Sequence, residues 1–124
     1  MQKQDYHLME IVEMNQDKKE FANELSPKEL INEVQYQSNS IVSKQIIKKA
    51  NGNITLFAFD KDESLTEHTS PYEAVVYIVD GEMEIRIADN PYSVKAGEII
   101  VLPPNVPHSL KAARQSKMLL TMVK

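Results

Sequence analysis

The chain has 124 residues and a net charge of −4, with 42% hydrophobic and 26% charged residues. These values are typical of a globular protein with one hydrophobic core. The negative charge argues against nucleic acid or an anionic membrane as a partner, because both are bound through concentrated basic surfaces. The lack of cysteine excludes disulfides, thiolate metal ligands and thiol nucleophiles. The longest apolar run, residues 74–79, is too short to span a bilayer.

Residues 1–37 differ from the rest of the chain, since they contain no glycine and only one proline. The segment Ser-Pro-Lys-Glu at 26–29 resembles a helix start with a capping box, and apolar residues recur at helical spacing over 30–34. We therefore predict an N-terminal extension over 1–37 with a short helix near 27–36. Apolar residues within 8–12 suggest an earlier amphipathic segment, for which a helix, a strand and a loose arm stay open. The first residues do not resemble a secretory signal, so we expect a cytoplasmic protein.

From residue 38 onward the pattern is that of short β-strands. Two candidate strands, 41–48 and 54–59, flank the turn sequence Asn51-Gly52-Asn53. Residues 60–71 are acidic, polar and irregular, which predicts a loop. Residues 74–79 are continuously apolar and rich in β-branched side chains, which predicts a strand buried on both faces.

The second half of the chain continues this pattern. Asp80-Gly81 predicts a two-residue hairpin, and 83–87 then alternates apolar and polar residues. Further turns and short strands follow: a turn at 89–91, strands near 92–96 and 98–102, a proline-rich loop at 103–107, and strands at 109–112 and 118–123. This gives about eight short antiparallel strands over 38–124, typical of an all-β jelly-roll barrel.

Two motifs lie within this strand pattern. The segment Gly97 to His108 has a glycine, a proline after five intervening residues, a turn residue at Asn105 and a closing histidine. The segment Glu67 to Gly81 carries His68 and ends on a glycine. Their spacing resembles the two signature motifs of the cupin superfamily, and the resemblance implies a double-stranded β-helix barrel with His68 and His108 at its mouth. Asn105 replaces the usual glycine; asparagine also tolerates a left-handed backbone, so we expect the turn to persist.

The resemblance also implies a metal site, but two of the four implied ligands are absent. Metal-binding cupins take two histidines and a carboxylate from the first motif and one histidine from the second. In this chain the second histidine position falls on Ser70 and the acidic position falls on Ala74. His68 and His108 remain, and two imidazoles leave most of a coordination sphere to water.

Glu73 is a possible substitute ligand, but strand parity argues against it. A shift of one residue in a strand turns the side chain to the opposite face. Ala74, Val76 and Ile78 are therefore expected to point into the barrel, whereas Glu73 reaches the pocket only through a bulge or from a loop. The predicted pocket consists of His68, His108, Glu73, Ala74, Val76, Ile78 and Phe59.

The roles of several other residues allow two interpretations. Met83, Met118 and Met122 are most simply core residues, although they could form the floor of an apolar ligand cavity. His7 lies outside both motifs, and we expect no chemical role for it. The chain has three glycines, so it contains neither a phosphate loop nor a dinucleotide-binding glycine pattern.

Two functions follow from these observations. The first is a small single-domain cupin that binds a small molecule in the barrel without a full metal site, as a homodimer paired through edge strands. The second is a metal-dependent oxygenase or isomerase, in which His68 and His108 hold a divalent transition metal (Zn, Ni, Fe or Mn) and Glu73 or water completes the sphere. The fold alone does not choose between them.

Overall fold

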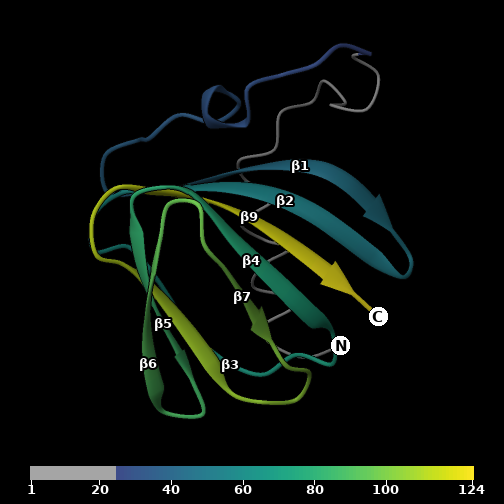
Figure 1. The fold of residues 1–124 in the computed structure, drawn as a ribbon, viewed down its shortest axis with the longest axis vertical. Helices are drawn as coiled ribbons and strands as arrows, with labels where there is room; N and C mark the ends of the chain where they lie inside the picture. The colour runs from purple at the N-terminus through teal and green to yellow at the C-terminus, as the bar shows by residue number, and fades with distance from the viewer. Residues whose placement is uncertain (1–24) are drawn as a thin grey trace.

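The computed structural model describes residues 25–124, and this part of the chain forms two antiparallel β-sheets that face each other (Figure 1). The strands in chain order are β1 (Ile41–Lys49), β2 (Gly52–Phe59), β3 (Ser64–His68), β4 (Glu73–Asp80), β5 (Glu82–Ile87), β6 (Asn90–Lys95), β7 (Ile99–Leu102), β8 (His108–Ala112) and β9 (Ser116–Val123). Within residues 25–124 no helix is long and apolar enough to cross a membrane.

The strand order defines the topology of the barrel. The first sheet has the order β1-β2-β9-β4-β7 and the second has the order β3-β8-β5-β6. Only β1–β2 and β5–β6 are consecutive strands of one sheet, so every other connection crosses from one sheet to the other. This alternation confirms the predicted all-β jelly-roll barrel, or double-stranded β-helix.

The main core fills the space between the two sheets. Alternate side chains of the facing strands are buried there, as strand geometry requires. The set includes Phe57 and Phe59 of β2, Val76 and Ile78 of β4, Met83 and Ile85 of β5, and Met118 of β9, all of which are at most 1% exposed. As predicted, β4 directs Ala74, Val76 and Ile78 inward.

A second, smaller core lies on the outer face of the first sheet. Here Val34 packs against Leu56 and Ala58 of β2, and Leu30 and Tyr36 border the cluster. This packing explains why five consecutive residues of β2 are buried although β2 has only one face toward the barrel interior. We call residues 30–36 the strap.

The predicted helix near 27–36 is reduced to a single 3₁₀ turn at Leu30–Asn32. The residue that precedes this turn is Glu29, which makes no side-chain capping bond, and Ser26 instead accepts a hydrogen bond from Lys28 Nζ. Ten residues are too few for a helix that is stable without tertiary support. The apolar residues of the strap are used to cover the sheet in an irregular conformation. The suggested segment at 8–12 lies outside the described residues.

The predicted hairpin at Asp80-Gly81 is wrong, because β4 and β5 belong to different sheets. Only Gly81 has a positive φ there, at 83°, and its turn lies so close to β9 that a Cβ atom would collide with the carbonyl oxygen of Gln115. The two-residue hairpin instead joins β5 to β6 through Ala88 and Asp89, whose φ values are 49° and 69°. Positive φ at both central residues is the signature of a type I′ turn.

The segment 60–71, predicted to be a loop, contains strand β3. This strand lies at the edge of the second sheet, and Leu65 is its one buried residue. An edge strand with one buried side chain has no apolar alternation that a sequence pattern could reveal. The strand matters for function, because it carries His68.

Candidate functional site

The two histidines of the motifs meet on neighbouring strands. His68 ends β3, His108 begins β8, and the two residues are direct partners in the β3–β8 ladder. Their ring centroids lie 4.4 Å apart and the ring planes meet at 71°. His108 is 7% exposed, whereas His68 is half-buried. The structure therefore brings together two imidazoles that are separated by about a third of the chain, as the motif spacing predicted.

Each imidazole is oriented by a backbone carbonyl two residues earlier in the chain. His68 Nδ1 lies 2.6 Å from the oxygen of Thr66, and His108 Nδ1 lies 3.2 Å from the oxygen of Val106. A carbonyl oxygen can only accept a hydrogen bond, so Nδ1 carries the proton in both rings. In the neutral form of each ring, Nε2 is then the basic nitrogen.

The loops of the two motifs are joined beside the histidines. Asn105 has a φ of 64°, which confirms the expected left-handed turn. Its backbone N–H donates a hydrogen bond of 2.7 Å to the carbonyl oxygen of Ser70. This contact fixes the loop that follows His68 against the loop that precedes His108.

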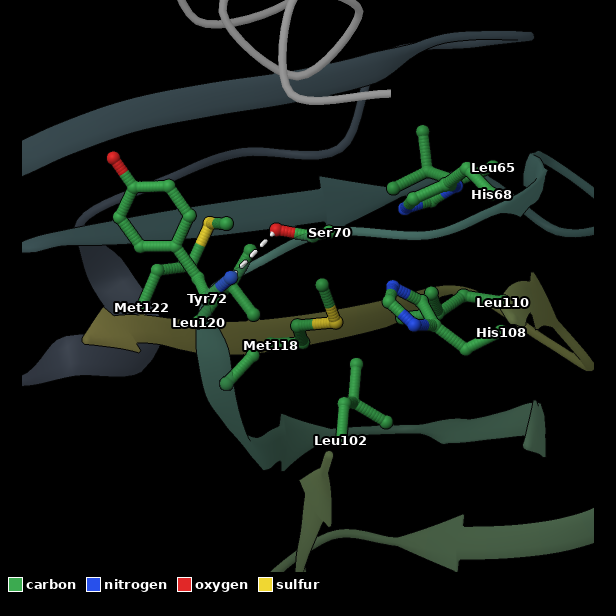
Figure 2. Close-up of a pocket in the computed structure, with 11 residues that line it drawn as sticks. Leu65, His68, Ser70, Tyr72, Leu102, His108, Leu110, Met118, Leu120 and Met122 are labelled. Atoms are coloured by element: carbon green, nitrogen blue, oxygen red, sulfur yellow. Dashed lines mark hydrogen bonds between the residues drawn. The ribbon is translucent and has the colours of Figure 1, made fainter. Parts of the chain in front are cut away.

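These loops close one end of an apolar pocket between the two sheets (Figure 2). The enclosed space is about 20 Å³, the size of a single water molecule. In Figure 2 the two histidines lie at one end and Tyr72 at the other, with Ser70 and Met118 between them. The lining consists of Leu65, His68, Ser70, Tyr72, Ala74, Leu102, His108, Leu110, Met118, Leu120 and Met122.

The structure places only some of the pocket residues predicted from the sequence in the pocket lining. His68, His108 and Ala74 line the pocket. Val76, Ile78 and Phe59 are completely buried in the core and do not belong to the lining. Glu73 is exposed, because it occupies the outward parity of β4 with no bulge beside it that would turn it inward.

Sequence reasoning missed several lining residues. Met118 and Met122 do line the pocket, in line with the second reading of those methionines, whereas Met83 lies in the core away from it. Leu102 and Leu110 could have been found from strand parity. Ser70 lies at the position where the first cupin motif has a histidine, and a polar residue there is itself a signal of a place in the pocket.

The side chains of residues 25–124 do not complete a metal centre. Over residues 25–124 no group of three or more His, Cys, Asp or Glu side chains is placed to hold a metal ion. Protein sites for zinc and similar metals use three or four protein ligands. The two imidazoles supply only two of these ligands, and the lining contains no carboxylate.

A jelly-roll barrel with histidines from two loop-flanked strands at one end of an internal pocket defines the cupin class of protein. The chain belongs to this family, because residues 55–124 match the family model for the cupin domain. A search of curated proteins found no match.

Solved structures support the same assignment. A conserved protein of unknown function from Streptococcus pyogenes is 34% identical, with 82% of this chain and 89% of that chain covered and a TM-score of 0.79. A cupin 2 conserved barrel domain protein from Leptotrichia buccalis is 43% identical, with a TM-score of 0.70; the match covers 73% of this chain and 44% of that longer chain. A cupin superfamily protein from Desulfitobacterium hafniense, 21% identical with a TM-score of 0.77 and coverage of 81% and 92%, shows the shared fold.

Proposed function

We propose that this cupin binds a small organic molecule at the barrel mouth, with His68 and His108 as its polar contacts and without a full metal site. The observation that carries the proposal is the pair of imidazoles, fixed in one tautomer and placed 4.4 Å apart at the end of an otherwise apolar pocket. Binding pockets typically combine apolar walls with a few polar groups that orient the ligand.

The size of the pocket limits how a ligand can bind. A space of about 20 Å³ takes only the end of a small head group, so the rest of the ligand lies at the mouth beside half-buried His68. Met118 and Met122 form part of the wall. Because methionine side chains change rotamer at low cost, they are the residues that can enlarge the pocket for a bulkier group.

Titration of amide resonances in ¹H–¹⁵N NMR spectra tests this proposal with small carboxylates, amides and amines as probes. We expect shifts at residues 68–72 and 105–110 and a loss of binding in His68→Ala and His108→Ala. Lys111→Ala, an exposed residue of β8, is the matched control and should bind as the native protein does. Shifts elsewhere on the surface, or binding that survives both histidine substitutions, would refute the proposal.

A metal-dependent oxygenase or isomerase is the second candidate. The Nδ1–carbonyl contacts favour it, because metal-binding histidines commonly donate their second ring nitrogen to such a group. Elemental analysis of protein purified without a histidine tag decides the question, followed by incubation with Zn, Ni, Fe and Mn. A stoichiometric metal that disappears in His68→Ala and His108→Ala would establish this candidate, and no uptake of any of the four would exclude it.

We also propose that the protein is a homodimer. Strand β7 lies at an edge of the first sheet and exposes Ile99 and Val101, which are 62% and 44% exposed. Val75 and Tyr77 are their ladder partners on β4 and share the same outward face. An open edge with apolar side chains favours pairing with a second copy.

A further inference from the structure

Ser70 is a buried polar residue, and its hydroxyl proton has no hydrogen-bond acceptor within the described part of the chain. It is 3% exposed and lines the pocket. Its Oγ accepts a hydrogen bond of 3.1 Å from the backbone N–H of Tyr72, which uses the oxygen as an acceptor only. No residue of 25–124 accepts a hydrogen bond from this hydroxyl. Burying an unpaired polar group costs free energy, so such a donor indicates a missing partner.

The charges around the pocket indicate what kind of partner is missing. The lining contains no Asp or Glu, and its two ionisable imidazoles can carry positive charge but not negative charge. A further cation lies near the wall, where Lys124 Nζ is 5.8 Å from the centroid of the Tyr72 ring. Glu73, the neighbour of Tyr72 in the sequence, is exposed on the outward parity of β4. The surroundings therefore favour an anionic head group over a cationic one.

The geometry of the pocket agrees with this chemistry. Three hydrogen-bonding side chains, those of His68, Ser70 and His108, line a space of about 20 Å³, which can take one oxygen of a ligand whose remaining atoms lie at the mouth. Figure 2 shows the Ser70 oxygen on the Tyr72 side of the histidines, so a ligand oxygen that enters the pocket has the hydroxyl on one side and the imidazoles on the other. A carboxylate oxygen accepts a hydrogen bond from a hydroxyl and, because Nδ1 of each ring already faces a carbonyl, from an imidazole whose Nε2 is also protonated.

We infer that Ser70 is a specificity-determining residue that donates a hydrogen bond to the carboxylate of a small organic acid, whose apolar body lies against the mouth. The inference rests on the proposed small-molecule binding and adds the class of ligand. It assigns a role to the position at which metal-binding relatives would carry a second histidine.

The test uses propionate, butyrate and benzoate, each compared with the amide and the amine of the same carbon skeleton. Affinity is measured on the full chain by NMR titration. We expect the carboxylate to bind best, the amide more weakly and the amine least. Ser70→Ala should weaken carboxylate binding about tenfold or more, as loss of a hydrogen bond to a charged group does. It should also reduce the preference for carboxylate over amide.

Two variants separate this role from a structural one. Ser70→Thr keeps the hydroxyl and should restore the preference, whereas Ser43→Ala removes a buried serine of β1 outside the pocket and should leave affinity unchanged. Equal affinity of the native protein and Ser70→Ala, or equal binding of acids and amines, would overturn the inference while the proposed function stands. If no probe of any class binds at tens of millimolar, Ser70 is paired with an ordered water only, and the proposed function fails with the inference.

Discussion

Gly81 and Gly97 both have a positive φ, but their surroundings differ. The φ values are 83° and 90°; a Cβ atom on Gly81 would collide with backbone and side-chain atoms of 115–116, whereas a Cβ on Gly97 would meet nothing within 4 Å. Replacing either glycine by alanine lowers the free energy of unfolding by about 1–2 kcal/mol, because alanine is disfavoured in a left-handed backbone conformation. The close packing adds a second cost at Gly81.

We therefore expect Gly81→Ala to lower the free energy of unfolding by about 3 kcal/mol or more, and Gly97→Ala by about 1–2 kcal/mol. Urea denaturation of both variants measures the difference. Equal destabilisation would show that the turn between β4 and β5 can move away from β9.

The contribution of Asp60 to stability is expected to depend on pH. Its carboxylate accepts hydrogen bonds from the backbone N–H of Asn39 at 2.7 Å and from Gln115 Nε2 at 3.1 Å. The Asn39 bond is the main cause that lowers the pKa of Asp60, and the Gln115 bond adds to it. A carboxyl group with a lowered folded-state pKa contributes stability above its unfolded-state pKa, and this contribution is lost as the pH falls through the folded value.

Asp60→Asn should consequently be less stable than the native protein at neutral pH. The two should converge as the pH falls from about 4, near the unfolded-state pKa, through the lower folded-state pKa of the native carboxylate. Thermal unfolding from pH 7 to pH 2 follows this convergence. A difference in stability that stays constant over the whole range would contradict the assigned role of the charge.

At the scale of elements, the strap is held by both apolar and polar contacts. Val34 is 5% exposed against β2, and the Tyr36 hydroxyl donates a hydrogen bond of 2.7 Å to Asp80. Burial, followed by this contact with Asp80, strongly raises the pKa of the Tyr36 phenol. Lys117 Nζ donates to the carbonyl oxygen of Ile31 at 2.6 Å and lies 4.9 Å from the Tyr36 ring centroid. The strap is thus part of the folded unit.

Val34→Asp should destabilise the protein by roughly 2–4 kcal/mol, because it places a carboxylate among apolar side chains. Ile31→Asp is the matched control, since Ile31 is 39% exposed and lies in the same segment. We expect a change within about 0.5 kcal/mol for the control. Chemical denaturation compares the two, and an equally small effect at Val34 would show that the strap does not stabilise the sheet.

At the scale of the whole molecule, the exposed face of β7 leads to a prediction about assembly. Sedimentation of the native protein at micromolar concentration should show a dimer. Ile99→Lys combined with Val101→Lys should yield a monomer that keeps its fold, because both residues are already exposed. Tyr92→Lys, on an exposed residue of β6 in the second sheet, should leave the dimer intact. A native monomer would contradict the proposed homodimer.

Much of the barrel could be predicted from local patterns. The inward parity of β4, the left-handed turn at Asn105 and most strand positions follow from alternation and from backbone preferences of single residues. The missed features have physical reasons. Strand β3 has one buried residue, and the two-residue hairpin places Ala88 at a positive φ, which is not typical of alanine.

The sequence by itself determined the fold family and the two histidines, because both depend on residue types at fixed spacing along the chain. Only the tertiary structure decided which groups share the pocket. The pairing of β3 with β8 placed His68 beside His108, and the packing between sheets put Ser70 and Met118 in the lining while it left Val76 and Ile78 in the core. These neighbours come from segments far apart in the chain, and local patterns do not specify which distant strands pair.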